Sequence, residues 1–194
     1  MRTRIACAAV IAAGTALAAG LAAPAQAAPT TAPTAAPTAA PEVTVGQRAH
    51  ESQRIPLAEY LAAPGADASA ARTAAAVPCY RQYFESYLAV HGTIYLKYGF
   101  TGKWCYNSST MYRLVILNPW EQSQGPGAVF DTLSHREIGR TINAAKTRSY
   151  AAMQWTAKGK VETMLGSVSF SDRPCLRAIA TRSPFATQDS SCQV

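Results

Sequence analysis

Aromatic residues are confined almost entirely to one part of this 194-residue chain. All five phenylalanines, all three tryptophans and every tyrosine except Tyr60 lie in residues 78–194. Aromatic side chains supply much of the apolar area that a small core buries. We therefore expect residues 78–194 to form the folded domain and residues 28–77 to form a disordered linker or pro-segment.

The N-terminus has the pattern of a secretory signal peptide. A basic start precedes an alanine-rich apolar run, which ends at the small-x-small triplet Ala25-Gln26-Ala27. The run is weakly hydrophobic and Cys7 lies near its start, which disfavours both a membrane anchor and a lipoprotein. Residues 1–27 therefore predict a secreted, extracellular protein with no stable membrane span after cleavage.

The expected linker begins with a repeat. Prolines stand at positions 29, 33, 37 and 41, a spacing that favours an extended, polyproline-like chain. A short apolar island at residues 55–61 has the pattern of two helical turns, with Pro56 suited to the first helical position. Two interpretations of the island remain open: a transient helix in a disordered linker, or a pro-segment that docks on the domain until a protease removes it.

The chain is basic, with a formal net charge of +7. A cationic exported domain is attracted to anionic cell-wall polymers, lipid headgroups or nucleic acid. The basic residues are spread along the sequence rather than clustered, so solubility alone also accounts for the charge.

Four cysteines follow the predicted signal peptide: Cys79, Cys105, Cys175 and Cys192. An even number in an exported chain of this size predicts two disulfides. If Cys105 points into the core, it pairs most naturally with Cys175, which leaves Cys79 for Cys192. Sequential pairing, Cys79 with Cys105 and Cys175 with Cys192, fits the loop lengths equally well. A zinc site is disfavoured because the sequence has no Cys-x-x-Cys pair.

Short apolar runs separated by turn residues predict a mainly β fold, a small β-sandwich or barrel. Residues 93–100 alternate with period two, and residues 103–106 follow after Thr101-Gly102, which predicts a hairpin with a two-residue turn. The other strand-like runs are residues 110–117, 129–133, 150–155, 160–165 and 168–170. Lys158-Gly159 is an expected turn between two of them.

Two stretches have helical features instead. Tyr80, Tyr83, Phe84, Tyr87 and Leu88 fall at helical spacing. Residues 134–137 have the form of a capping box. Each stretch predicts a peripheral helix.

From residue 78 onward the chain resembles small secreted actinomycete proteins of unknown function. The resemblance depends on the combination of signal peptide, low-complexity spacer and disulfide-containing β domain, and on the strand Trp104 to Asn107. It implies the fold class and the compartment, and no functional residue is carried over from it.

The predicted hairpin suggests a binding surface. In its register Tyr95, Lys97, Trp104 and Tyr106 share one face, while Cys105 lies on the opposite face. The four side chains would form an aromatic platform with a cationic edge, suited to sugar rings or a partner protein. A structural alternative is that these rings only cover the strand pair or are buried by a loop.

Motifs for catalysis or cofactor binding are missing from the sequence. It contains no Gly-x-Ser-x-Gly, no glycine-rich phosphate loop and no His-Glu-x-x-His, so the catalytic residues are unknown and we expect no cofactor and no metal. His135, Arg136, Glu137 and Arg140 are the residue types of a small secreted ribonuclease. A solvated loop or an exposed helix face carries the same residue types.

The sequence therefore favours a non-enzymatic extracellular domain that binds a cell-envelope polymer, a carbohydrate or a protein partner. A secreted effector, such as a bacteriocin-like toxin or a protease inhibitor, is the alternative. For an inhibitor, basic residues stand beside structural constraints at Arg173-Pro174-Cys175 and at residues 181–184. A small secreted ribonuclease is the third hypothesis.

Overall fold

The structure, a computed structural model, describes residues 42–72, 77–125 and 127–194. The predicted signal peptide and the proline repeat lie outside the described residues. The described residues belong to one compact unit. Its elements are β1 (Val43–Ile55), α1 (Leu57–Leu61), the 3-10 helix η1 (Ala68–Arg72), β2 (Cys79–Val90), β3 (Thr93–Cys105), β4 (Val115–Ser123), β5 (Val129–Ile142), β6 (Arg148–Thr163), β7 (Gly166–Asp172), β8 (Cys175–Thr181) and β9 (Ala186–Asp189).

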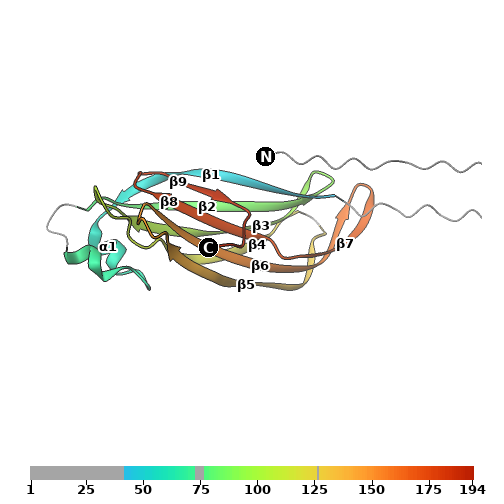
Figure 1. The fold of residues 1–194 in the computed structure, drawn as a ribbon. Helices are drawn as coiled ribbons and strands as arrows, with labels where there is room; N and C mark the ends of the chain where they lie inside the picture. Colours follow the sequence, from blue (N-terminus) through green and yellow to red (C-terminus); the bar gives the residue numbers. More distant parts are fainter. Residues whose placement is uncertain (1–41, 73–76, 126) are drawn as a thin grey trace, which may run out of the picture. The chain divides into compact units, whose positions relative to one another are not determined.

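The strands form two antiparallel sheets. The first has the order β1-β2-β3-β4, and the second has the order β5-β6-β8-β9. β7 pairs with the C-terminal part of β6, on the same edge where β8 pairs with its N-terminal part. In Figure 1 the strands run along the long direction of the unit, with α1 at one end and β7 at the other. The predicted mainly β fold is confirmed as a sandwich of two sheets.

The main core lies between the two sheets, and the two sheets contribute side chains of different size. The first sheet contributes rings, including Phe84, Tyr98 and Phe100, whereas the second contributes many alanines, including Ala151 and Ala178. All five are fully buried. Small residues opposite large ones let the two layers interdigitate at the density of a protein interior.

Polar contacts hold the two sheets together along one side of the sandwich. The Gln82 side chain of β2 pairs with the backbone of Ala186 in β9, donating at 3.1 Å and accepting at 3.0 Å. Gln188 donates to the backbone carbonyl oxygen of Glu85 at 2.8 Å. These bonds fix the backbone of β2 at Glu85.

β1 corrects the predicted linker, because Val43–Ile55, which precede residue 78, form a strand of the described fold. β1 pairs with β2 from Val43 opposite Val90 to Ile55 opposite Cys79. Most of its side chains are polar and exposed, and Ile55 is buried. An edge strand held by backbone hydrogen bonds needs few apolar side chains, so the distribution of rings did not reveal it.

The predicted hairpin is also corrected. The turn lies at His91 and Gly92, whose φ angles of 47° and 76° give the left-handed geometry that two-residue hairpin turns require. It joins β2 to β3, and β3 continues through the expected turn to Cys105. Gly102 lies inside this strand, and a Cβ there would come within 2.7 Å of the Phe84 ring.

Both predicted helices are strands. Residues 80–88 lie in β2, where alternation places Phe84 and Leu88 in the core and Tyr83 and Tyr87 on the other face. Residues 134–137 lie within β5. The expected turn at residues 158–159 lies inside the continuous strand β6.

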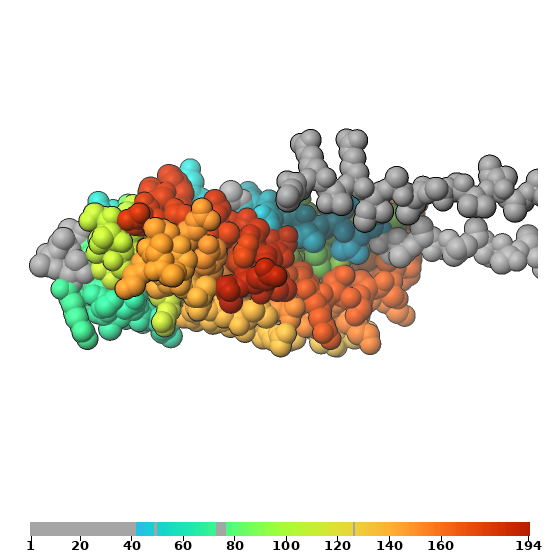
Figure 2. All heavy atoms as spheres, in the orientation of Figure 1, coloured from blue at the N-terminus to red at the C-terminus, as the bar shows by residue number. Residues whose placement is uncertain are grey.

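α1 and η1 form a second, smaller core on the outer face of the first sheet. Tyr60 is fully buried there, and its hydroxyl donates to the carbonyl oxygen of Arg113 at 2.8 Å and accepts the N–H of Asp67 at 3.0 Å. Pro56 is the N-cap of α1. The apolar island is therefore a packed helix of the domain, and its atoms lie at one end of the unit in the space-filling view (Figure 2).

The disulfides join Cys79 to Cys105 and Cys175 to Cys192. The sequential pairing is confirmed, and the pairing of Cys105 with Cys175 is wrong. Cys79 and Cys105 stand opposite each other on β2 and β3, with their Cα atoms 4.1 Å apart. Both lie in the cluster beneath α1, so Cys105 points away from the main core because β3 does not turn at residues 101–102.

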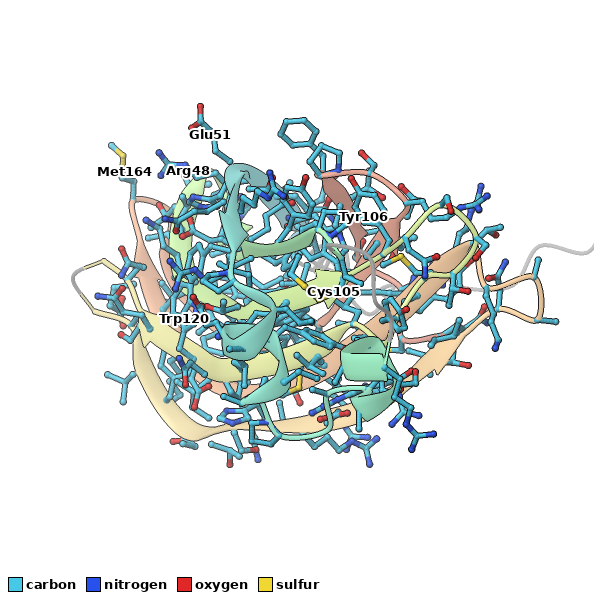
Figure 3. All side chains as sticks on the ribbon, turned by 90° about the vertical axis from the view of Figure 1, so that its left-hand side faces the viewer. Arg48, Glu51, Cys105, Tyr106, Trp120 and Met164 are labelled. Atoms are coloured by element: carbon cyan, nitrogen blue, oxygen red, sulfur yellow. A yellow bond between two sulfur atoms is a disulfide. The ribbon has the colours of Figure 1, made fainter. Side chains whose placement is uncertain are left out.

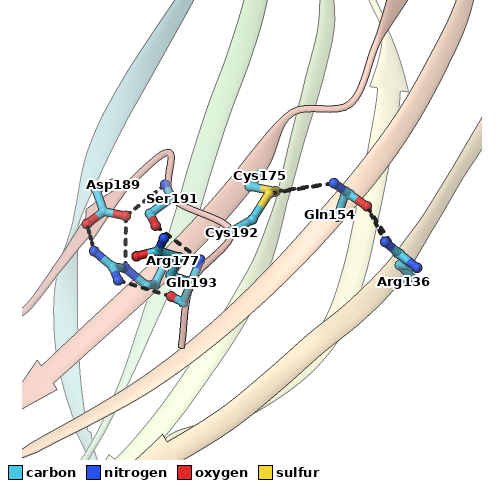
Figure 4. The surroundings of a disulfide bond; sticks show 8 residues. All are labelled: Arg136, Gln154, Cys175, Arg177, Asp189, Ser191, Cys192 and Gln193. Atoms are coloured by element: carbon cyan, nitrogen blue, oxygen red, sulfur yellow. Dashed lines mark hydrogen bonds and ion pairs between the residues drawn. A yellow bond between two sulfur atoms is a disulfide. The ribbon is translucent and has the colours of Figure 1, made fainter.

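The second disulfide fastens the C-terminal tail to β8 (Figure 4). Cys175 is buried, whereas Cys192 is exposed. Arg177 of β8 forms an ion pair with Asp189 and donates to the carbonyl oxygen of Gln193 at 3.0 Å. Burial opposes ionisation of Asp189, but its hydrogen bonds with Arg177 and the Ser191 N–H hold its pKa below the ordinary value.

Candidate functional site

The structure does not bring the four side chains of the predicted platform together on one exposed face. Tyr95 and Trp104 are fully buried in the main core, whereas Lys97 and Tyr106 are half-buried. A register shift in the pairing of β2 with β3 leaves Tyr95 without a cross-strand partner. It turns inward, and its hydroxyl donates to a carboxylate oxygen of Asp172 at 2.7 Å.

A different group of rings occupies the outer face of the first sheet. We call it the aromatic face, and it consists of His50 from β1, Tyr83 and Tyr87 from β2, and Trp120 from β4. All four side chains are partly exposed. Trp120 stands opposite Gly99, and Gly99 stands opposite Glu85, so Glu85 lies in the middle of the group. Figure 3 shows Trp120 well apart from Tyr106 of the predicted platform.

Two glycines let rings of the aromatic face lie directly on the sheet. A Cβ at Gly99 would come within 2.9 Å of the Trp120 indole nitrogen, and one at Gly46 would come within 1.9 Å of the Tyr87 ring. Because neither residue has a side chain, Trp120 and Tyr87 pack against backbone. The rings are therefore supported from below by a rigid sheet.

Ring contacts order the aromatic face further. Tyr83 and Trp120 are stacked, with centroids 5.6 Å apart and planes 6° from parallel. The planes of the His50 and Tyr83 rings are 84° apart, an edge-to-face contact, and their centroids are 4.8 Å apart. Offset stacks and edge-to-face contacts are the two favoured arrangements of ring pairs. The three rings therefore form a preorganised group.

A β-bulge places His50 in this group. The pairing of β1 with β2 shifts between Ala49 and Ser52, so His50 and Glu51 both stand opposite Tyr83. A bulge of this kind re-aims side chains at a sheet edge. It directs His50 onto the Tyr83 ring, while Glu51 extends away from the ribbon in Figure 3.

Polar atoms on the aromatic face lack partners. The Nε2 atom of His50 and the Nε1 atom of Trp120 are buried and have no hydrogen-bond partner within the described residues. Burial raises the pKa of Tyr83 to about 12, and the negative charge of Glu85 adds to the shift. Buried polar atoms normally have partners, so these two nitrogens are unsatisfied positions beneath the rings of the aromatic face.

A shallow hollow of about 190 Å³ adjoins the aromatic face. Its lining is largely polar and consists of Glu51, Gln53, Arg81, Gln82, Tyr83 and Thr101. Beyond it, Glu59 of α1 forms ion pairs with Arg81 and Lys103. These ion pairs lie at the edge of the smaller core beneath α1, and the aromatic face lies outside that core.

Comparison with protein families, curated proteins and solved structures finds no match to this chain. Function is therefore inferred from the chemistry of the site, because a β-sandwich supports many unrelated functions. Aromatic rings on a rigid sheet, beside unpartnered polar atoms and a polar hollow, have the chemistry of a binding surface.

The residue types that suggested a ribonuclease do not converge. On β5, His135 contacts Glu121 of β4 at 2.7 Å, whereas Arg140 binds both carboxylate oxygens of Glu137. Arg136 donates twice to the Gln154 side chain. Both guanidinium groups are thus engaged within the protein, and the His135 contact connects the two sheets.

The segments that suggested an inhibitor are fixed by the fold. Residues 173–174 join β7 to β8, and the Pro174 carbonyl oxygen accepts the Trp155 N–H at 2.9 Å. Arg182 donates to the Ser108 carbonyl oxygen at 2.7 Å. The loop before β9 presents Phe185 to solvent, where 63% of it is exposed.

Neither a metal site nor a membrane-spanning helix is seen in the parts of the chain that the structure describes. No group of three or more His, Cys, Asp or Glu side chains there is arranged to hold a metal ion. None of the helices in those parts has the length and apolar character needed to cross a bilayer.

Sequence reasoning missed the aromatic face because its residues come from three strands. Tyr83, Glu85 and Tyr87 alternate on one face of β2, and this period-two pattern was the available signal. It was masked because the other face of β2 carries Phe84 and Leu88, which gave the stretch a helical spacing.

Proposed function

We propose that this protein is a secreted, non-enzymatic binding domain that holds a sugar-containing polymer of the cell envelope against the aromatic face. The predicted signal peptide supports secretion. The two disulfides support an oxidising compartment. The main support for the binding role is the Tyr83–Trp120 stack on an open sheet face.

The chemistry of sugars fits this surface. A sugar ring has an apolar C–H face, which packs on aromatic rings through dispersion and burial of apolar area. Its hydroxyl groups need hydrogen-bond partners, which the polar side chains of the adjoining hollow supply. A flat, supported face suits a polymer that runs across the sheet.

Trp120→Ala should reduce retention of the purified protein on isolated cell walls by at least about tenfold. Loss of one stacked ring removes roughly 1.5 kcal/mol or more of contact energy. Retention by the wild type should survive high salt, because stacking is not screened as ion pairs are. The measurement is the bound fraction in a pull-down with increasing salt.

Phe185→Ala is the matched control, because it removes an exposed ring that lies outside the aromatic face. It should be retained like the wild type, and Trp120→Phe should bind at an intermediate level. Thermal unfolding of each variant confirms that it is folded. Equal retention of Trp120→Ala and wild type, or no retention of the wild type at any salt concentration, contradicts the proposal.

A further inference from the structure

Glu85 is an unusual residue to find at the centre of an aromatic face. Only 12% of its side chain is exposed, and it lies between Tyr83 and Tyr87 on the outer side of β2. Its backbone is held by the hydrogen bond from Gln188. A carboxylate that is largely removed from water needs a positively charged or hydrogen-bonding partner.

The protein supplies only a weak partner for this carboxylate. Among the described side chains its one ion-pair contact is His50, with Nε2 3.8 Å from Oε2, beyond hydrogen-bond distance. Arg48 stands directly opposite Glu85 across the β1–β2 pairing, but it is exposed and forms no ion pair with it. The Glu85 carboxylate is therefore open to a cation from outside.

We propose that Glu85 makes the aromatic face selective for a ligand that carries an ammonium group, as amino sugars do. This inference rests on the proposed function, because it names the class of polymer that the same surface binds. An ammonium group donates hydrogen bonds to the carboxylate, and the faces of Trp120, Tyr83 and Tyr87 attract a cation.

The charges around the site favour an ammonium group over an anion. An anionic sugar could approach Arg48 or Lys97, but Glu85 at the centre of the face and Glu51 in the adjoining hollow repel it. Arg48 and Lys97 are at least partly exposed, so water and salt screen them more than they screen Glu85. The more buried charge dominates selection.

The test compares three soluble oligosaccharides of equal length by calorimetric titration. One is a chitosan oligosaccharide with free amines, one is its N-acetylated chitin counterpart, and one is an oligogalacturonate with carboxylates. At a pH where the amines are protonated, the wild type should bind the chitosan oligosaccharide about tenfold more tightly than the N-acetylated one, and the oligogalacturonate least.

Glu85→Gln should abolish this preference, because the amide keeps the shape of the side chain and removes its charge. Its affinity for the chitosan oligosaccharide should fall about tenfold, and its affinity for the N-acetylated one should not change. Glu162→Gln is the matched control: it removes an exposed carboxylate of β6, in the second sheet and outside the aromatic face, and should keep the preference.

The outcomes separate this inference from the proposed function. An unchanged amine preference in Glu85→Gln, or tightest binding of the N-acetylated or carboxylate oligosaccharide by the wild type, overturns the amine selectivity while Trp120-dependent retention on cell walls still stands. Absence of that retention overturns the proposed function. Thermal unfolding of Glu85→Gln establishes that a loss of preference comes from a folded protein.

Discussion

The double variant Cys79→Ala/Cys105→Ala should lose about 5 kcal/mol of unfolding free energy. The bridge closes a loop with a sequence separation of 26 residues, which corresponds to about 3.5 kcal/mol of chain entropy in the unfolded state. Both cysteines are fully buried beneath α1. Removing their sulfur atoms leaves a cavity that adds about 1 to 2 kcal/mol.

Cys175→Ala/Cys192→Ala is the comparison, and it should cost about 3 kcal/mol. Its loop is shorter, with a separation of 17 residues, and Cys192 is exposed, so little cavity forms. Denaturant unfolding of the two double variants and the wild type measures the difference. An equal loss in both variants, or a larger loss for the second, contradicts the assignment of the buried bridge to the α1 cluster.

Gly99→Ala should destabilise the protein by about 3 kcal/mol. A Cβ at this position would lie 2.2 Å from the backbone carbonyl oxygen of Phe84, and backbone in the middle of a sheet does not move cheaply. Overpacking against fixed atoms costs roughly 1–3 kcal/mol. The same Cβ would push Trp120 off the sheet, so binding to cell walls should fall as well.

Gly46→Ala is the matched control for this variant. The three atoms nearest to a Cβ at Gly46 all belong to the far end of the Tyr87 side chain, which rotates away at low cost. We expect a loss below about 1 kcal/mol. Denaturant unfolding of both variants measures the difference. Similar losses of unfolding free energy would show that the contact between the new Cβ and the Phe84 carbonyl oxygen is not what destabilises Gly99→Ala.

Local patterns predicted the fold class but not its boundaries. Turn residues and alternating runs are local signals, so a mainly β fold followed from them, and the two disulfides followed from the even number of cysteines. β1 was not predicted as a strand, because an edge strand of polar residues has no apolar pattern of its own and is held by its pairing with β2. The sequential disulfides depend on Cys79 and Cys105 being cross-strand neighbours, which loop length alone did not decide.

The sequence predicted rings on an outer strand face but not which rings. Tyr95 and Trp104 of the expected platform are core residues, and other rings lie on the outer face of the first sheet. The register shift turns Tyr95 inward, and the uninterrupted strand β3 places Trp104 inside and Cys105 outside, because one residue of register exchanges the two sides of a strand. His50 and Trp120 join the site only through long-range strand pairing.

The most direct test of the binding surface uses the indole N–H signals of the three tryptophans in a nuclear magnetic resonance titration. Trp104 and Trp155 are fully buried and donate to Ser183 and Glu121, whereas the Trp120 N–H has no partner within the described residues. On addition of soluble cell-wall fragments, the Trp120 signal should shift while the other two stay in place. Shifts at Trp104 or Trp155 with an unmoved Trp120 signal, or no shift at all, would contradict binding at the aromatic face.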